Sequence, residues 1–166
     1  MRSRLLPLML ALAGACAFAL AVQSAWWSAG AVSIGPFGAR DCFGGECGER
    51  GLSWTGGTDL WMRAGVAARA AGYIAGFILV VVAGALAAKR IPRLMARASI
   101  VSIITAVAAG GYFAFAFPAA ALGGQATLGH GMFLFAAGIV LGVAAAVFTL
   151  RMPSLREDEN PGQAGG

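Results

Sequence analysis

The stretch AGVAARAAGYIAGFILVVVAGALAA, residues 64–88, decides the fold class of this chain. It contains one charged residue, Arg69, and no Asp, Glu or Lys. A helix needs about 20 mostly apolar residues to cross about 30 Å of hydrocarbon, and in lipid it must pair its own backbone polar groups. Three further stretches meet the same criterion, at residues 5–23, 98–122 and 128–150. The sequence therefore predicts four transmembrane helices.

The composition of the whole chain agrees with this prediction. Of its 166 residues, 59% are hydrophobic and only 11% are charged, whereas soluble domains average about 25% charged residues. A soluble enzyme and a disordered chain are both disfavoured, since disordered chains are poor in hydrophobic residues. We expect an all-α membrane protein: a four-transmembrane-helix bundle with a small extracytoplasmic β-rich cap formed by the first outer loop, residues 24–63.

The first apolar stretch has two interpretations. Arg2 and Arg4 precede it, and Ala19-Leu20-Ala21 fits the small residues of a signal-peptidase site. The apolar run continues almost to Trp26, beyond the 7–15 residues usual for a signal peptide. We therefore expect a retained helix, with cleavage as the alternative.

Basic residues predict the orientation in the membrane. Eight of the twelve lie before the first stretch, between the second and third, or after the fourth, and such residues mark the cytoplasmic side. Both termini are then cytoplasmic, and residues 153–166 are predicted to form a disordered cytoplasmic tail. Four tryptophans fall at or beyond the opposite boundary and are predicted to anchor the membrane interface or the cap: Trp26, Trp27, Trp54 and Trp61.

The same distribution explains the net charge of +5. The positive charge therefore does not indicate a nucleic-acid partner, and the expected partner is the lipid bilayer. Arg outnumbers Lys eleven to one, and Ala and Gly are abundant. This bias favours a bacterial source, and therefore the cell inner or plasma membrane.

The outer loop carries the features of a small folded cap. Val32, Ile34 and Phe37 precede turn residues and predict a strand, and the segment 51–54 predicts another. Cys42 and Cys47 lie outside the cell in this topology, where a disulfide would persist and stabilise the cap. Cys16, in the first helix, is predicted to be a buried apolar filler.

The groups that catalysis or transport would need are missing from the sequence. No phosphate loop, nucleophile elbow or metal-binding His-Glu motif occurs, and the apolar stretches contain no carboxylate for proton coupling. We predict no enzyme activity, cofactor or metal. Arg69 is predicted to be an anchor near the outer end of its helix, with a ligand or pore role as the alternative.

Two glycine pairs predict close helix contacts. Gly72 and Gly76 lie four residues apart on the second helix, and Gly138 and Gly142 on the fourth. Such pairs let helix backbones approach closely in lipid. They fit packing within one bundle or, alternatively, between copies of the chain.

These features together resemble the claudin and PMP22-like tetraspan membrane proteins. The matching positions are Trp26 or Trp27 after the first helix, the pair Cys42 and Cys47, and Ala68-Arg69-Ala70 in the second helix. Gly51-Leu52-Ser53-Trp54 is similar to the family's Gly-Leu-Trp element, although here it follows the cysteines. The resemblance implies a four-helix bundle whose outer sheet assembles laterally or binds a partner.

We therefore expect a non-enzymatic membrane protein whose cap contacts other proteins, as a homo-oligomer or as a small accessory subunit of a membrane complex. One alternative is a membrane thiol-disulfide oxidoreductase that uses Cys42 and Cys47. Another is a channel or transporter module.

Overall fold

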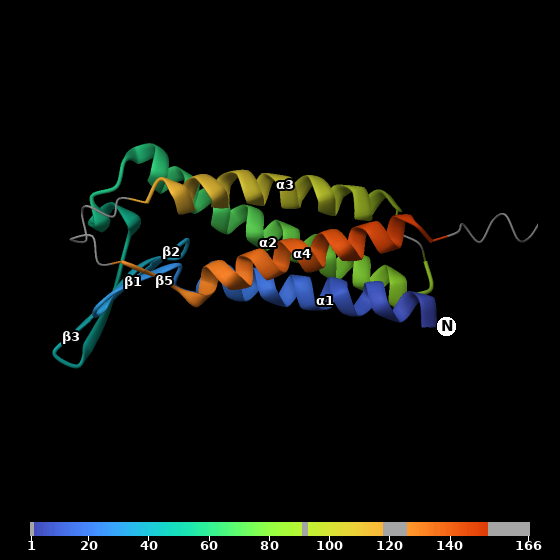
Figure 1. Ribbon diagram of the computed structural model, residues 1–166, viewed down its shortest axis with the longest axis horizontal. Coiled ribbons are helices and arrows are strands. Elements are labelled where there is room, and N and C mark those ends of the chain that lie inside the picture. The colour runs from blue at the N-terminus through green and yellow to red at the C-terminus, as the bar shows by residue number, and fades with distance from the viewer. Residues whose placement is uncertain (1, 91–92, 118–125, 153–166) are drawn as a thin grey trace, which may run out of the picture.

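The computed structural model describes residues 2–90, 93–117 and 126–152 of the chain. Within these ranges four long helices run side by side, and a small sheet lies at one end of them (Figure 1). The helices are α1 (Arg2–Gln23), α2 (Asp59–Ala87), α3 (Arg93–Phe115) and α4 (His130–Leu150). All four are long and apolar enough to cross a membrane, which is the arrangement of a multi-pass membrane protein.

The helix bounds differ from the predicted ones mainly at polar ends. α2 begins at Asp59, five residues before the predicted start, because Thr58 caps it: its side-chain oxygen accepts a hydrogen bond from the Trp61 N–H at 3.2 Å. α1 and α3 likewise begin earlier than predicted, at basic residues. The predicted residues 118–122 of the third helix and the predicted tail 153–166 lie outside the described residues.

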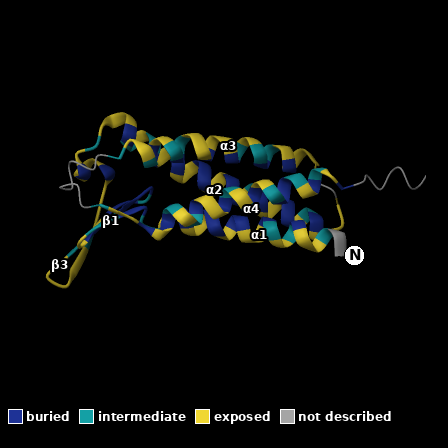
Figure 2. Cartoon of the chain, in the orientation of Figure 1, coloured by how far each residue is buried: buried dark blue, intermediate teal, exposed yellow. Residues whose placement is uncertain are grey.

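Each helix packs mainly against two neighbours, and α1 packs extensively against both α2 and α4. α2 also packs against α3, and the contact between α3 and α4 is the smaller one. Buried residues form inward stripes on each helix while the outward faces stay exposed (Figure 2). Many outward residues are large and apolar, including Phe77, Phe133 and Val140, each about two-thirds exposed (69%, 66% and 67%). Outward apolar faces of this extent are suited to lipid.

All four predicted packing glycines are buried inside this bundle. A Cβ on Gly72 would lie 2.5 Å from Val22, and one on Gly138 would lie 3.1 Å from the Phe18 ring, so that both face α1. Gly76 also faces α1, whereas Gly142 faces Ile103 of α3 and Leu79 of α2. The structure therefore brings these glycines to contacts between helices of the same chain.

In the described part of the chain, the cap is a five-stranded antiparallel sheet with the order β4-β3-β2-β1-β5. Its strands are β1 (Trp27–Ala29), β2 (Val32–Gly35), β3 (Gly38–Phe43), β4 (Glu46–Arg50) and β5 (Thr127–Leu128). Four of them come from the first loop. The fifth immediately precedes α4, and its Leu128 pairs with Trp27. The sheet thus joins two distant parts of the chain above the helix ends.

The predicted strand at residues 51–54 is wrong. Leu52–Thr55 form a short 3₁₀ helix, η1, closed by Gly56 in the left-handed conformation with φ 68°. Leu52 is buried and packs against Gly65 of α2, so the chain turns here from the sheet edge towards the helix. The Trp54 N–H donates to the Gly51 carbonyl at 3.1 Å, and the Thr55 hydroxyl donates to the Leu52 carbonyl at 2.7 Å, so these carbonyls have local partners.

Candidate functional site

Aromatic side chains join the cap to the bundle. Trp26, Trp27 and Trp61 are almost fully buried, with exposed fractions of 1%, 4% and 1%. Phe113 of α3 lies among all three, with ring centroids 5.7, 5.2 and 4.7 Å from theirs. Phe135 of α4 packs against Trp26 at 4.9 Å. One aromatic cluster therefore contacts the sheet and the helices together.

Three of the four tryptophans that were predicted to anchor the membrane interface or the cap belong to this cluster. Trp26, Trp27 and Trp61 lie inside the protein, where they hold the cap, and Trp61 belongs to α2 because that helix begins at Asp59. Trp54 is the exception, since it is 45% exposed. The sequence analysis did not single out Phe113 and Phe135, because the sequence of an apolar stretch does not show which residues each side chain contacts.

The β3–β4 hairpin extends away from the bundle and is the most exposed part of the cap (Figure 1, Figure 2). Cys42 and Cys47 stand opposite each other on its two strands and form a disulfide, with an S–S distance of 2.06 Å. Four of the five residues of β4 are exposed, and this strand is an outer edge of the sheet. Phe43, at the hairpin turn, is 62% exposed.

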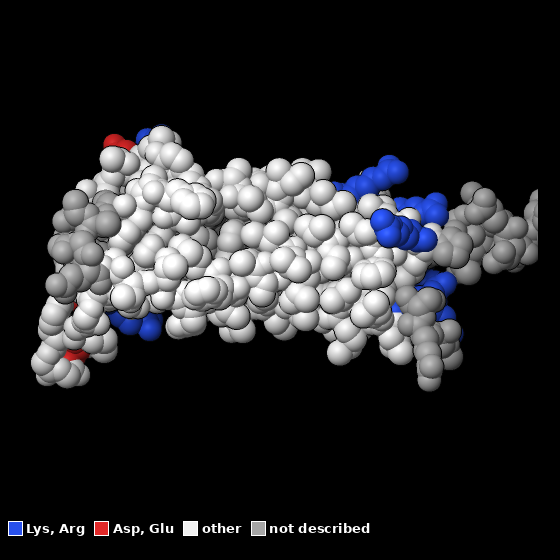
Figure 3. All heavy atoms as spheres, viewed as in Figure 1, with Lys and Arg blue, Asp and Glu red and all other residues white. Residues whose placement is uncertain are grey.

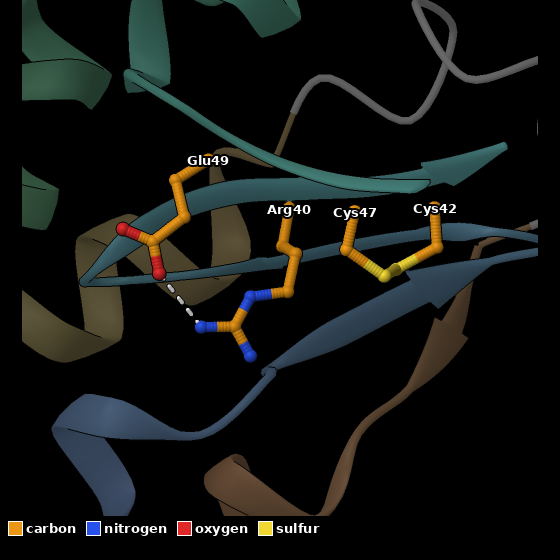
Figure 4. The surroundings of a disulfide bond; sticks show 4 residues. All are labelled: Arg40, Cys42, Cys47 and Glu49. Atoms are coloured by element: carbon orange, nitrogen blue, oxygen red, sulfur yellow. Dashed lines mark hydrogen bonds and ion pairs between the residues drawn. A yellow bond between two sulfur atoms is a disulfide. The ribbon is translucent and has the colours of Figure 1, made fainter. Parts of the chain in front are cut away.

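Ion pairs reinforce both faces of this hairpin. Arg40 and Glu49 pair at 2.8 Å and lie on the same side as the disulfide (Figure 4). Arg50 and Asp41 pair at 3.5 Å. Each arginine of the hairpin thus has a carboxylate partner, and Glu46 is the remaining charge on strands β3 and β4.

Cys16, the cysteine outside the disulfide, is exposed, contrary to its predicted burial. The buried stripe of α1 runs through Ala11, Ala15 and Phe18, and residue 16 points away from that stripe.

Among the described residues, no cluster of three or more His, Cys, Asp or Glu side chains is placed to hold a metal ion.

Arg69 is exposed on α2 and lines a cavity of about 670 Å³ between that helix and the cap. Arg63 and the β2–β3 turn residue Phe37 line the same cavity. Arg63 was not among the residues that the sequence singled out.

The other described basic residues gather mostly at the bundle end opposite the cap, and an uncharged belt separates the two ends in this view (Figure 3). Two of these arginines also tie segments together there. Arg4 donates to the Lys89 carbonyl at 2.7 Å, and Arg93 donates to the Met152 carbonyl at 3.1 Å.

Comparison with known proteins gives no relative: no family model, no curated protein and no solved structure matches this chain.

Proposed function

We propose that this chain is a non-enzymatic membrane protein of claudin-like architecture whose extracytoplasmic cap binds other proteins. The partner is a second copy of the chain or a larger membrane complex of which this protein is a small subunit. The cap faces away from the cytoplasm of a bacterial cell, and the basic end of the bundle lies in the cytoplasm.

The exposed edge of the β3–β4 hairpin is the observation that carries this proposal. An unpaired sheet edge is a template for a strand from another chain. Among the strands of the described residues β4 is such an edge, and four of its five residues are exposed. The disulfide holds the hairpin in shape before a partner arrives, which lowers the entropic cost of binding.

The hairpin geometry identifies the backbone groups that a partner would use. The two-residue turn at Gly44 and Gly45 is closed by the pair Phe43 and Glu46, and such closing pairs are hydrogen-bonded. Hydrogen-bonded and non-hydrogen-bonded pairs alternate along antiparallel strands. The N–H and C=O of Glu49, opposite Arg40, therefore point outward from the sheet.

Substitution of Glu49 tests the proposal directly. Glu49→Pro removes the outward N–H, whereas Glu49→Ala keeps it and removes only the ion pair with Arg40. We expect native mass spectrometry in mild detergent to find the wild-type chain as a defined oligomer or with one stoichiometric partner. Glu49→Ala should retain that assembly and Glu49→Pro should lose it.

Two results would refute the proposal. One is a wild-type chain that is strictly monomeric and retains no protein partner. The other is an assembly that survives Glu49→Pro with unchanged stoichiometry.

A further inference from the structure

The cavity beside Arg69 is a groove between the cap and the first turns of α2. Its walls come from the β2–β3 turn, from η1 and from α2. Phe37, Leu52, Met62 and Val66 give it an apolar lining, and Val66 is 64% exposed. At one edge, therefore, the groove offers apolar side chains to a ligand.

Two arginines flank this apolar lining. At 100° per residue, Arg63 and Arg69 lie about 120° apart around the axis of α2, with Val66 between them, and about 9 Å apart along it. Both are exposed. Within the described part of the chain neither makes an ion pair or a side-chain hydrogen bond, whereas Arg40 and Arg50 on the cap each have a carboxylate partner. Two guanidinium groups are thus free to bind an anion.

The length of α2 gives the depth of these arginines in the membrane. The helix has 29 residues and is about 43 Å long, but the hydrocarbon layer takes only about 20 residues. Counted back from the basic end at Ala87, 20 residues reach Ala68. Arg69 then lies at the outer hydrocarbon boundary and Arg63 within the headgroup layer, where lipid phosphates are found.

We propose that this groove binds an anionic phospholipid of the leaflet on the cap side. Arg63 and Arg69 hold the phosphate, since guanidinium groups match phosphate oxygens in pairs, and Val66 and Met62 contact the start of an acyl chain. A small soluble anion would leave the apolar lining unused, whereas a lipid uses both parts. The inference rests on the membrane placement in the proposed function and is independent of the protein contacts of the cap.

Lipid retention by the purified full-length chain tests the inference. The chain is mixed with equal amounts of phosphatidylglycerol and phosphatidylcholine of identical acyl chains, and bound lipid is counted by native mass spectrometry. The wild type should retain one molecule of phosphatidylglycerol in preference to phosphatidylcholine. Arg63→Gln and Arg69→Gln should each weaken that preference roughly fivefold, and the double variant roughly 25-fold.

Two further variants separate a seated lipid from general charge attraction. Arg97→Gln removes an exposed arginine at the opposite end of the bundle and should retain lipid as the wild type does. Val66→Trp leaves the charge unchanged but fills the groove, and it should reduce retention as strongly as the double glutamine variant.

Three outcomes would overturn the inference: equal retention of both lipids by the wild type, an unchanged preference in the double glutamine variant, or an unchanged preference in Val66→Trp. If one of these outcomes is found while Glu49→Pro still abolishes assembly, only the lipid site is refuted. If the wild-type chain does not assemble but retains lipid as expected, only the proposed protein contacts are refuted.

Discussion

Two indole N–H groups in this protein serve helix carbonyls that lack a partner within their own helix. The last carbonyls of any helix have no intrahelical donor. Near the end of α1, the Ala21 carbonyl accepts from Trp26 Nε1 at 2.9 Å and from the Ser24 N–H, just past the helix, at 3.3 Å. Near the end of α3, the Phe113 carbonyl accepts from Trp61 Nε1 at 2.8 Å. These tryptophans therefore act through hydrogen bonds as well as through packing.

Trp61→Phe tests these two contributions together. Phenylalanine keeps part of the stacking on Phe113, but it leaves the Phe113 carbonyl without its indole donor in a buried site and leaves space where the larger ring was, so we expect a loss of at least about 2 kcal/mol in the free energy of unfolding. The measurement is unfolding in mixed micelles at increasing SDS fraction, followed by circular dichroism. Trp54→Phe is the control, since that side chain is 45% exposed, and it should change stability by less than about 0.5 kcal/mol. Equal effects of the two variants would contradict this account of Trp61.

We predict opposite changes in stability when two helix glycines are replaced by alanine. A Cβ on Gly131 would lie 2.8 Å from the carbonyl oxygens of Ser24 and Ala25 and 2.7 Å from the Trp26 ring, whereas one on Gly111 meets nothing within 4 Å. Gly131→Ala must displace backbone atoms and should destabilise the protein by about 1–3 kcal/mol. Gly111→Ala should be neutral or stabilising by up to about 1 kcal/mol. The same SDS titration decides the signs, and a destabilising Gly111→Ala would show that helix packing there is tighter than described.

At the scale of elements, the four helices could be predicted from sequence because hydropathy over about 20 residues is a strong local signal. Their polar ends could not be predicted in the same way. Asp59 and Arg63 lower the apolar character of the first turns of α2, yet the cap by Thr58 extends the helix across them. The 3₁₀ helix at Leu52 was missed for a related reason: its apolar alternation fits a strand, and the packing of Leu52 against Gly65 of α2 is a contact that the sequence does not show.

The fifth strand was beyond sequence reasoning. Thr127 and Leu128 form a two-residue strand whose partner, β1, lies about a hundred residues earlier in the chain. The Thr127 hydroxyl also donates to the Ser28 carbonyl at 3.1 Å. A pairing this short carries no periodic signal, and it depends on the packing of α1 against α4, which places the two segments side by side. Of the candidate sites, the cysteine pair was readable from sequence, while the arginine-flanked groove needed the fold.

The disulfide should stabilise the hairpin locally. Cys42 and Cys47 are separated by five positions, and closing so short a loop is worth about 2 kcal/mol in the chain-entropy picture. We expect the double variant Cys42→Ser and Cys47→Ser to speed amide hydrogen exchange in β3 and β4 while the helices exchange as before. Cys16→Ser, at the exposed free cysteine, is the matched control and should change hydrogen exchange neither in β3 and β4 nor in the helices. Faster exchange throughout the helices would instead make the disulfide essential to the whole fold.

At the scale of the whole molecule, charge and sheet position mark its two ends differently. The cap end pairs its Arg40 and Arg50 with carboxylates. Among the described residues, the opposite end collects Arg4, Lys89, Arg90, Arg93, Arg97 and Arg151. Basic residues beside transmembrane helices remain on the cytoplasmic side, so this asymmetry predicts one orientation of the bundle.

Cysteine accessibility tests that orientation in intact cells. In a background with Cys16, Cys42 and Cys47 replaced by serine, Ser53→Cys places a thiol on the exposed side of η1, and Lys89→Cys places one at the basic end. A membrane-impermeant maleimide should label the first variant in intact cells and the second only after the membrane is permeabilised. Because both sites are exposed, a difference between them reports the side of the membrane and not burial. The reverse pattern would put the hairpin in the cytoplasm, where neither a lasting disulfide nor an extracytoplasmic partner fits.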